Sequence, residues 1–179
     1  MNGRTRGAAI LACSLLVAGC SSAEQGDKPG GDPKEAVLTV ARTYMDAANR
    51  DDWKTACGLM SARYRHGSVD DCVTTHNDKA PEPSPSAKPG SGRADIDPAE
   101  ASTVVEVPAV DPHPAGYGVM VTYAYTWPGK PPESSRLVMR LISEGGAWVV
   151  DQREGVRSKH MARNPEPASL VRSMLTAGG

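Results

Sequence analysis

The sequence of 179 residues has no phenylalanine, and aromatic residues account for only 4% of it. A hydrophobic core must therefore come from Val, Leu, Met and Ala, together with three Trp and five Tyr. A surplus of basic residues is also lacking, because 20 Lys and Arg stand against 21 Asp and Glu. Proteins that bind nucleic acid normally carry such a surplus, since contacts with phosphates supply most of their affinity. The length suits one domain, and the charge balance argues against nucleic acid as a partner.

The common catalytic motifs are also missing. There is no Gly-x-Ser-x-Gly, no His-Glu-x-x-His and no glycine-rich phosphate loop between a strand and a helix, which argues against the usual hydrolases and nucleotide-binding enzymes. The adjacent Asp70 and Asp71 do not face each other on a helix, so we interpret them as helix N-terminal charges rather than an acid and base pair. The histidines lack the spacing of metal ligands, and we expect neither a metal nor a cofactor. They are His66, His76, His113 and His160.

The N-terminus, by contrast, carries a clear targeting pattern. Two arginines precede an apolar run over 8–18, which is too short to span a bilayer of roughly 30 Å as a stable helix. The run ends in Val-Ala-Gly-Cys at 17–20, which resembles the lipobox of bacterial lipoproteins. This resemblance implies a type II signal peptide over 1–19, cleavage between Gly19 and Cys20, and a diacylglycerol lipid on the Cys20 sulfur. The alternatives are an ordinary secretory signal with a chance cysteine, or a buried helix.

Residues 20–32 contain no apolar side chain large enough to anchor them. We therefore predict a flexible tether between the lipidated cysteine and a folded domain. At about 3.3 Å per residue, the tether reaches roughly 40 Å when it is extended. The domain is then expected on the extracytoplasmic face of the cell membrane.

The four cysteines fit export. Cys13 would leave with the signal peptide and Cys20 would be lipidated, which leaves Cys57 and Cys72. In an oxidising compartment this pair would form a disulfide that closes a loop of about 15 residues and stabilises the fold by on the order of 3 kcal/mol. The alternative is two separate buried thiols. A redox-active pair is disfavoured because a Cys-x-x-Cys motif is absent.

Helical periodicity begins after this tether. Asp32 can cap a helix, a proline suits its first position, and apolar residues then recur at spacings of three and four over 33–49. Asp51 or Asp52 begins a second predicted helix, whose apolar stripe continues to Tyr64. A short third helix is predicted to start within 68–71, which includes the acidic pair described above.

The second half of the chain is typical of β-strands. Residues 78–100 are rich in Pro, Ser and Gly, so we predict a surface loop, for which O-linked glycosylation is a weaker hypothesis. Four strands follow in an antiparallel meander, over 101–109, 119–127, 136–142 and 147–153. We therefore predict an α+β fold, with N-terminal helices packed on a curved sheet of about four strands. The single domain covers 33–155, and 156–179 form a polar tail with a short apolar helix near its end.

Four features carry a resemblance to a known superfamily. They are the opening helix with Tyr44, the polar corner and tryptophan at 49–53, the cysteine pair, and the last strand at 146–151. Their order resembles the cone-shaped nuclear transport factor 2-like (cystatin-like) superfamily, especially its small exported actinobacterial lipoproteins. The resemblance implies a sheet that wraps the first helix and leaves a pocket at the open end of the cone.

The resemblance also suggests where a ligand would bind. Isomerases of this superfamily hold an acid or base and a tyrosine in the mouth of the cone. Tyr44, Tyr64, Tyr123 and Tyr125 are the predicted pocket-lining residues, and Asp151 could approach the same cavity. No position matches a specific catalytic motif of those enzymes, so no catalytic residue is carried over. The alternative is that the tyrosines belong to the walls and the core.

The predicted function is therefore a membrane-anchored extracytoplasmic lipoprotein that binds or docks without catalysis. Its partner would be the membrane through the lipid on Cys20, and an unknown ligand or envelope protein. One alternative is a small-molecule pocket enzyme of the ketosteroid-isomerase-like kind, which would need an enclosed titratable group with a perturbed pKa. Another is a spacer or accessory domain for an envelope protein, which would expose an apolar patch.

Overall fold

The computed structural model describes residues 32–78 and 93–177, in which four helices precede five strands and two further helices. The predicted signal peptide, Cys20, nearly all of the tether and the centre of the predicted loop lie outside the described residues, so these remain predictions. No helix among the described residues has both the length and the apolar character needed to cross a membrane. The elements are α1 (Pro33–Asn49), α2 (Trp53–Gly58), α3 (Ala62–Arg65), α4 (Val69–Asp78), β1 (Asp95–Ile96), β2 (Glu100–Val107), β3 (Gly116–Thr126), β4 (Glu133–Glu144), β5 (Ala147–Gly155), α5 (Ser158–Arg163) and α6 (Pro167–Thr176).

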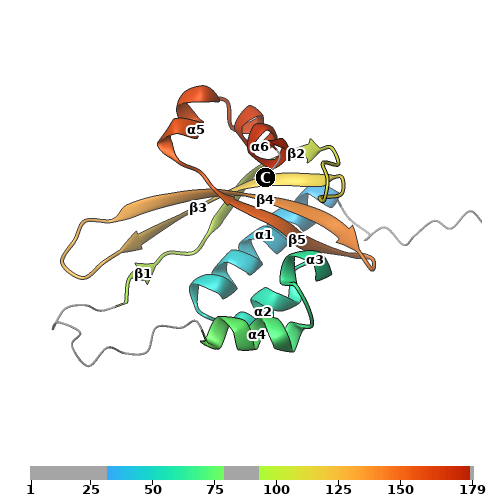
Figure 1. The fold of residues 1–179 in the computed structure, drawn as a ribbon. Helices are drawn as coiled ribbons and strands as arrows, with labels where there is room; N and C mark the ends of the chain where they lie inside the picture. Colours follow the sequence, from blue (N-terminus) through green and yellow to red (C-terminus); the bar gives the residue numbers. More distant parts are fainter. Residues whose placement is uncertain (1–31, 79–92, 178–179) are drawn as a thin grey trace, which may run out of the picture.

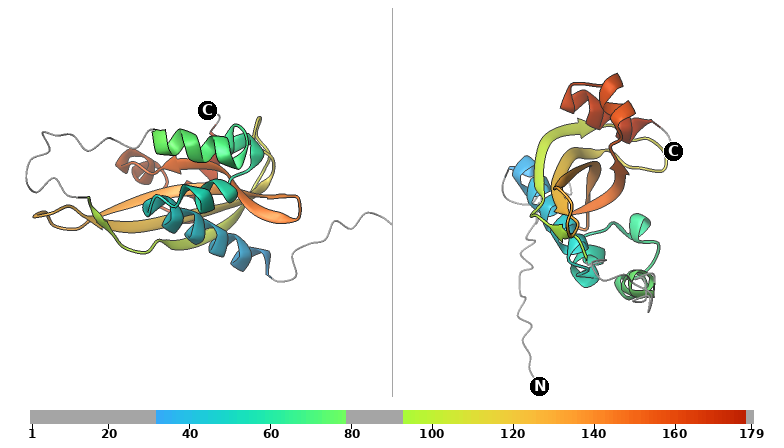
Figure 2. Two further views of the ribbon diagram at one scale, coloured as in Figure 1. Left: turned by 90° about the horizontal axis from the view of Figure 1, so that it is seen from below. Right: turned by 90° about the vertical axis from the view of Figure 1, so that its left-hand side faces the viewer.

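All five strands join one antiparallel sheet. Strand β3 pairs with β4, which pairs with β5, while β1 and β2 both pair with the other edge of β3. The sheet curls around the helices, and the long β3–β4 hairpin extends past them (Figures 1 and 2). The predicted α+β class and its curved antiparallel sheet are confirmed. The short strand β1 falls inside the segment that we predicted as a loop.

Helix α1 forms because its N-terminus and its apolar stripe agree. Asp32 accepts a hydrogen bond from the Lys34 amide at 2.9 Å, and a proline occupies the first turn. Val37, Ala41 and Tyr44 lie on the face that packs against the concave side of the sheet, and each is at most 2% exposed. The predicted helix over 33–49 is confirmed.

The predicted second helix is wrong in its length. The structure ends α2 at Gly58 and begins α3 at Ala62, because the chain between them bonds to strand β5 instead of continuing the helix. The Val150 amide donates to the Leu59 carbonyl, and the Ser61 amide donates to the Val150 carbonyl, both at 2.8 Å. Apolar periodicity alone could not reveal this contact with a strand about 90 residues away in the chain.

The C-terminal segment belongs to the folded domain, which corrects the predicted boundary at residue 155. Helix α6 covers the outer face of the sheet, opposite α1 (Figures 1 and 2). Its residues Leu170, Val171 and Leu175 are at most 4% exposed. They pack in a second core with Val105, Val107, Met120 and Val138 of the sheet. The sheet is thus covered on both faces, and the tail is not a free polar extension.

Candidate functional site

A pocket of about 320 Å³ opens between the helical layer and the end of strand β5. Helices α1, α2, α3 and α4 all contribute to its walls, and β5 contributes a single residue, Arg153. Ring side chains of Tyr44, Trp53, Tyr64, His66 and His76 make up much of the lining. This volume suits a small molecule rather than a macromolecule.

Two tyrosines line the pocket and interact with each other through their hydroxyls. Tyr44 comes from α1 and is 2% exposed, whereas Tyr64 comes from α3 and is partly buried. Burial raises the pKa of the Tyr64 phenol far above its usual range, and the neighbouring Tyr44 phenol raises it further. Tyr64 therefore stays neutral at physiological pH and remains able to donate a hydrogen bond.

The other two predicted lining residues lie elsewhere. Tyr123 and Tyr125 stand on strand β3 with their ring centroids 6.3 Å apart, and neither lines this pocket. The Tyr125 hydroxyl instead donates to the Glu133 carboxylate across the hairpin at 2.8 Å. The structure thus brings Tyr44 and Tyr64 together and places the β3 pair apart from them.

Charged groups stand around the mouth of the pocket. The Arg65 guanidinium donates to the carbonyls of Cys57 and Met60, at 3.2 and 3.0 Å, and so satisfies the C-terminal end of α2. Arg153 is exposed and acts electrostatically on the Tyr64 phenol. Asp71 accepts hydrogen bonds from the Ser68 hydroxyl and amide, which lower the pKa of its carboxyl. Arg153 is therefore the cation at the mouth that is not occupied in capping a helix.

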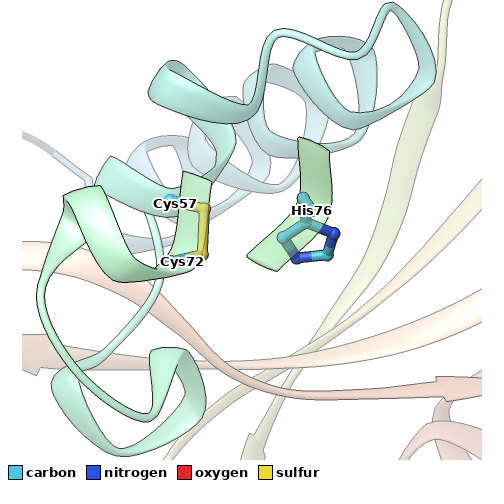
Figure 3. Close-up of side chains that lie close together, drawn as sticks. All are labelled: Cys57, Cys72 and His76. Carbon is cyan, nitrogen blue, oxygen red and sulfur yellow. A yellow bond between two sulfur atoms is a disulfide. The ribbon is translucent and has the colours of Figure 1, made fainter. Parts of the chain in front are cut away.

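The disulfide closes the helical side of the pocket. Cys57 of α2 and Cys72 of α4 are bonded, with their Cα atoms 6.0 Å apart, as predicted. His76 lies one turn along α4 from Cys72 (Figure 3). Its imidazole stacks on the Trp53 indole with ring centroids 3.9 Å apart and an interplanar angle of 8°. The bridge and the stacked rings together fix α4 against α2.

Asp151 does not point into this pocket, although we considered it for the cavity. Its side chain is 1% exposed and accepts hydrogen bonds from the Ser61 hydroxyl at 2.7 Å and from Arg63 at 2.7 and 3.1 Å. His113 Nδ1 lies 2.9 Å from the same carboxylate. Ser61 and His113 both bind Asp151 and not each other, so this is not a serine, histidine and aspartate relay. Its role is to join α3, β5 and the loop before β3.

The sequence did not predict the contacts that Asp151 makes with Ser61, Arg63 and His113. Ser61 also accepts a hydrogen bond from the Tyr64 amide and so caps α3. A serine before a short polar segment is a usable capping signal. The pairing of Asp151 with Arg63 and His113 depends on a register shift in β5 and on a loop conformation, which leave no local pattern.

A buried arginine lies on the other face of the sheet. Arg140 is completely buried, and its guanidinium donates to the carbonyls of Pro108, Pro114 and Leu175 at 2.6 to 2.8 Å. Burial lowers the pKa of Arg140, while the nearby Asp151 carboxylate opposes this effect. The arginine ties the end of α6 to the loop between β2 and β3, so it is a structural cation and not a ligand-binding one.

Comparison with solved structures gives a weak likeness in fold. No protein-family model and no curated protein matches the sequence. Among solved structures, the chain is similar to an NTF-2 like protein of unknown function from Shewanella oneidensis MR-1, with 12% identity and a TM-score of 0.39. The match covers 69% of this chain and 98% of that one.

Proposed function

We propose that this protein is a lipid-anchored, extracytoplasmic binding module that takes up a small, planar organic anion in the pocket between α1–α4 and β5. The observation that carries the proposal is the lining of this pocket. Aromatic rings line the pocket beside two tyrosine hydroxyls, and Arg153 is the described lining arginine that does not cap a helix. The targeting pattern before Cys20 supports the location, and the nuclear transport factor 2-like resemblance supports the cone-shaped fold.

The pocket chemistry defines the ligand class. Trp53 and His76 line the pocket as a stacked pair of flat rings, and such aromatic surfaces favour contact with a planar group. The Tyr44 and Tyr64 hydroxyls are hydrogen-bonded to each other, and this pair offers its remaining O–H group to a ligand oxygen atom. Arg153 offers a planar guanidinium that suits a carboxylate or phosphate group. A ring that carries an anionic group satisfies all three features at once.

The same lining supports binding rather than catalysis. Among the described residues that line the pocket, Asp71 is the only carboxylate; the two histidines are His76, which stacks on Trp53, and the exposed His66. The pKa of Asp71 is held low by the hydrogen bonds from Ser68, which makes it a weak base at neutral pH. An isomerase-like enzyme would need a base with a raised pKa beside the tyrosines. We therefore place binding before the pocket-enzyme alternative, and before a spacer domain that would need no pocket.

Tryptophan fluorescence tests this proposal. In the W127F/W148F variant, Trp53 is the only remaining tryptophan and it lines the pocket. Benzoate should quench its emission saturably, and benzylamine should not. Loss of the Arg153 charge in R153Q should weaken benzoate binding roughly tenfold, which corresponds to about 1.4 kcal/mol.

Lys130 supplies the matched control. It is exposed in the turn between β3 and β4 and does not line the pocket. K130Q removes the same positive charge from the protein and should leave benzoate affinity unchanged. Equal affinities for benzoate and benzylamine, or equal losses in R153Q and K130Q, would contradict an anion site at this pocket.

A further inference from the structure

Three metal-binding side chains meet at the helical wall of the pocket. They are Cys57 of α2 and Cys72 and His76 of α4 (Figure 3). One ligand atom from each lies within 4.8 Å of the other two. In the structure the two sulfurs are joined in the disulfide, and in that form they offer no thiolate to a metal. The cluster would become a ligand set once the disulfide is reduced.

We propose that reduction of the Cys57–Cys72 disulfide creates a binding site for a cuprous ion, with Cys57, Cys72 and His76 as ligands. Two thiolates and one imidazole form a soft donor set of the kind that thiophilic d10 ions prefer. The spacing of the histidines in the sequence did not indicate this site, because it depends on the packing of α4 against α2. The proposal is independent of the organic ligand proposed above.

Met60 supplies a fourth soft donor and favours copper over zinc. Its thioether Sδ lies 3.8 Å from the Cys72 Sγ, and the residue is 5% exposed. Thioether sulfur is a ligand for the cuprous ion, whereas zinc sites in proteins use thiolate, imidazole and carboxylate ligands. Three donors therefore lie within 4.8 Å of one another, and the Met60 thioether lies beside one of them, Cys72.

The scaffold holds these donors in place without the metal. His76 follows Cys72 by four positions on α4, so their side chains lie on the same face. The Trp53 indole stacks on His76 and restricts the orientation of the imidazole. Arg65 holds the carbonyls of Cys57 and Met60, which fixes the segment that carries two of the sulfurs. A preorganised set needs little rearrangement when the bridge opens.

The pocket provides the route for both the reductant and the metal. Cys72, Met60 and His76 line it, whereas Cys57 is completely buried behind them. A thiolate from a small dithiol attacks the Cys72 sulfur, the S–S bond breaks, and Cys57 leaves as a thiolate. The second thiol of the reductant then displaces Cys72, so two electrons pass to the protein and the dithiol becomes a cyclic disulfide. Binding of the cuprous ion by both cysteines as thiolates releases the protons of their thiol groups.

Copper titration of the reduced protein tests this inference. The protein is reduced with dithiothreitol, desalted without oxygen, and titrated with cuprous ion held by a coloured chelator whose absorbance falls as copper is removed. The reduced protein should take one copper per chain, and the oxidised protein should take none. Reduced H76N should bind the cuprous ion at least about tenfold more weakly. Even the loss of a group that only orients a metal ligand lowers metal affinity by about that factor. M60L should weaken copper binding and leave zinc binding unchanged.

His66 supplies the matched control. It lines the same pocket, is exposed, and is not one of the clustered ligands. Asparagine tolerates its left-handed backbone, so H66N should fold and bind copper as the parent does. Far-UV circular dichroism of each reduced protein accompanies the titration. Equal copper affinity of H76N and H66N, whether or not the reduced chain keeps its helices, overturns the proposal, as does equal uptake by the oxidised protein.

Discussion

At Asp151, a buried carboxylate is kept ionised by partners from separate parts of the chain. Burial alone would raise the pKa of Asp151. Hydrogen bonds from Arg63, His113 and Ser61 outweigh burial, so the pKa of Asp151 lies below its usual value. Because the folded-state pKa is lowered, the stabilisation is present above about pH 4 and is lost as the pH falls through the folded-state pKa.

Asp151→Asn should therefore destabilise the domain at neutral pH. The substitution leaves the Arg63 guanidinium and the Ser61 hydroxyl beside a neutral amide, and we expect a loss of roughly 3 kcal/mol in the free energy of unfolding. Urea denaturation at pH 7 and pH 3 measures this loss, which should shrink at the lower pH because stabilisation by the ionised carboxylate declines below about pH 4. Asp97→Asn, at an exposed position, should change stability little at either pH. A loss that is equal at both pH values would show that charge is not the cause.

Among the elements, α6 depends on a close approach to strand β3. A Cβ built at Gly118 lies 2.5 Å from Val171 Cγ1 and 2.9 Å from Leu175 Cδ1, both in α6. Branched and buried side chains at this distance have little room to move. The glycine at 118 thus allows α6 to pack closely against the outer face of the sheet.

Gly118→Ala should loosen α6 selectively. We expect a loss of about 1–3 kcal/mol in the free energy of unfolding, as for other overpacked cores. Hydrogen exchange should quicken in α6 before it quickens in α1. Gly58→Ala is the control, because its Cβ would meet no atom within 4 Å and an alanine suits the helix. Unchanged exchange in α6 of the Gly118 variant would mean that the helix does not depend on this contact.

Helices α1 and α6 also show how far the sequence predicts the fold. For α1, Asp32, the proline after it and the apolar stripe are all local, and the helix was predicted with the bounds that the structure has. For α6, the apolar residues near 170–175 were visible, but their partner surface was not. Val105, Val107, Met120 and Val138 come from three strands, and only strand pairing shows that they share one face.

The candidate site also combines residues that the sequence predicted with contacts that it did not. The superfamily resemblance suggested four pocket-lining tyrosines, and only Tyr44 and Tyr64, which belong to the helices that precede the sheet, line this pocket. Arg153 and the stacking of Trp53 on His76 were not predicted. Both depend on how the end of β5 and helix α4 approach each other across the pocket, which no local spacing encodes.

At the scale of the whole molecule, the folded domain starts at α1, directly after the predicted tether. If the proposed lipid is present on Cys20, it would hold the domain within roughly 40 Å of the membrane surface, given about 3.3 Å per extended residue. A diacylglycerol group carries two acyl chains, and two chains are enough for stable anchoring, whereas a single chain binds reversibly. The lipid would keep the pocket at the membrane surface without a spanning helix.

Cys20→Ala should abolish fatty-acid labelling and release the protein from membranes, because the acyl chains have no other attachment point in the proposed scheme. Metabolic labelling with a radioactive fatty acid, followed by separation of membrane and soluble fractions, measures both effects. Cys13→Ala is the matched control, since it removes a cysteine from the predicted signal peptide and should leave labelling and membrane association intact. Label that persists in the Cys20 variant would contradict the lipid anchor. Label lost without release from the membrane would instead mean that the domain itself holds the protein there.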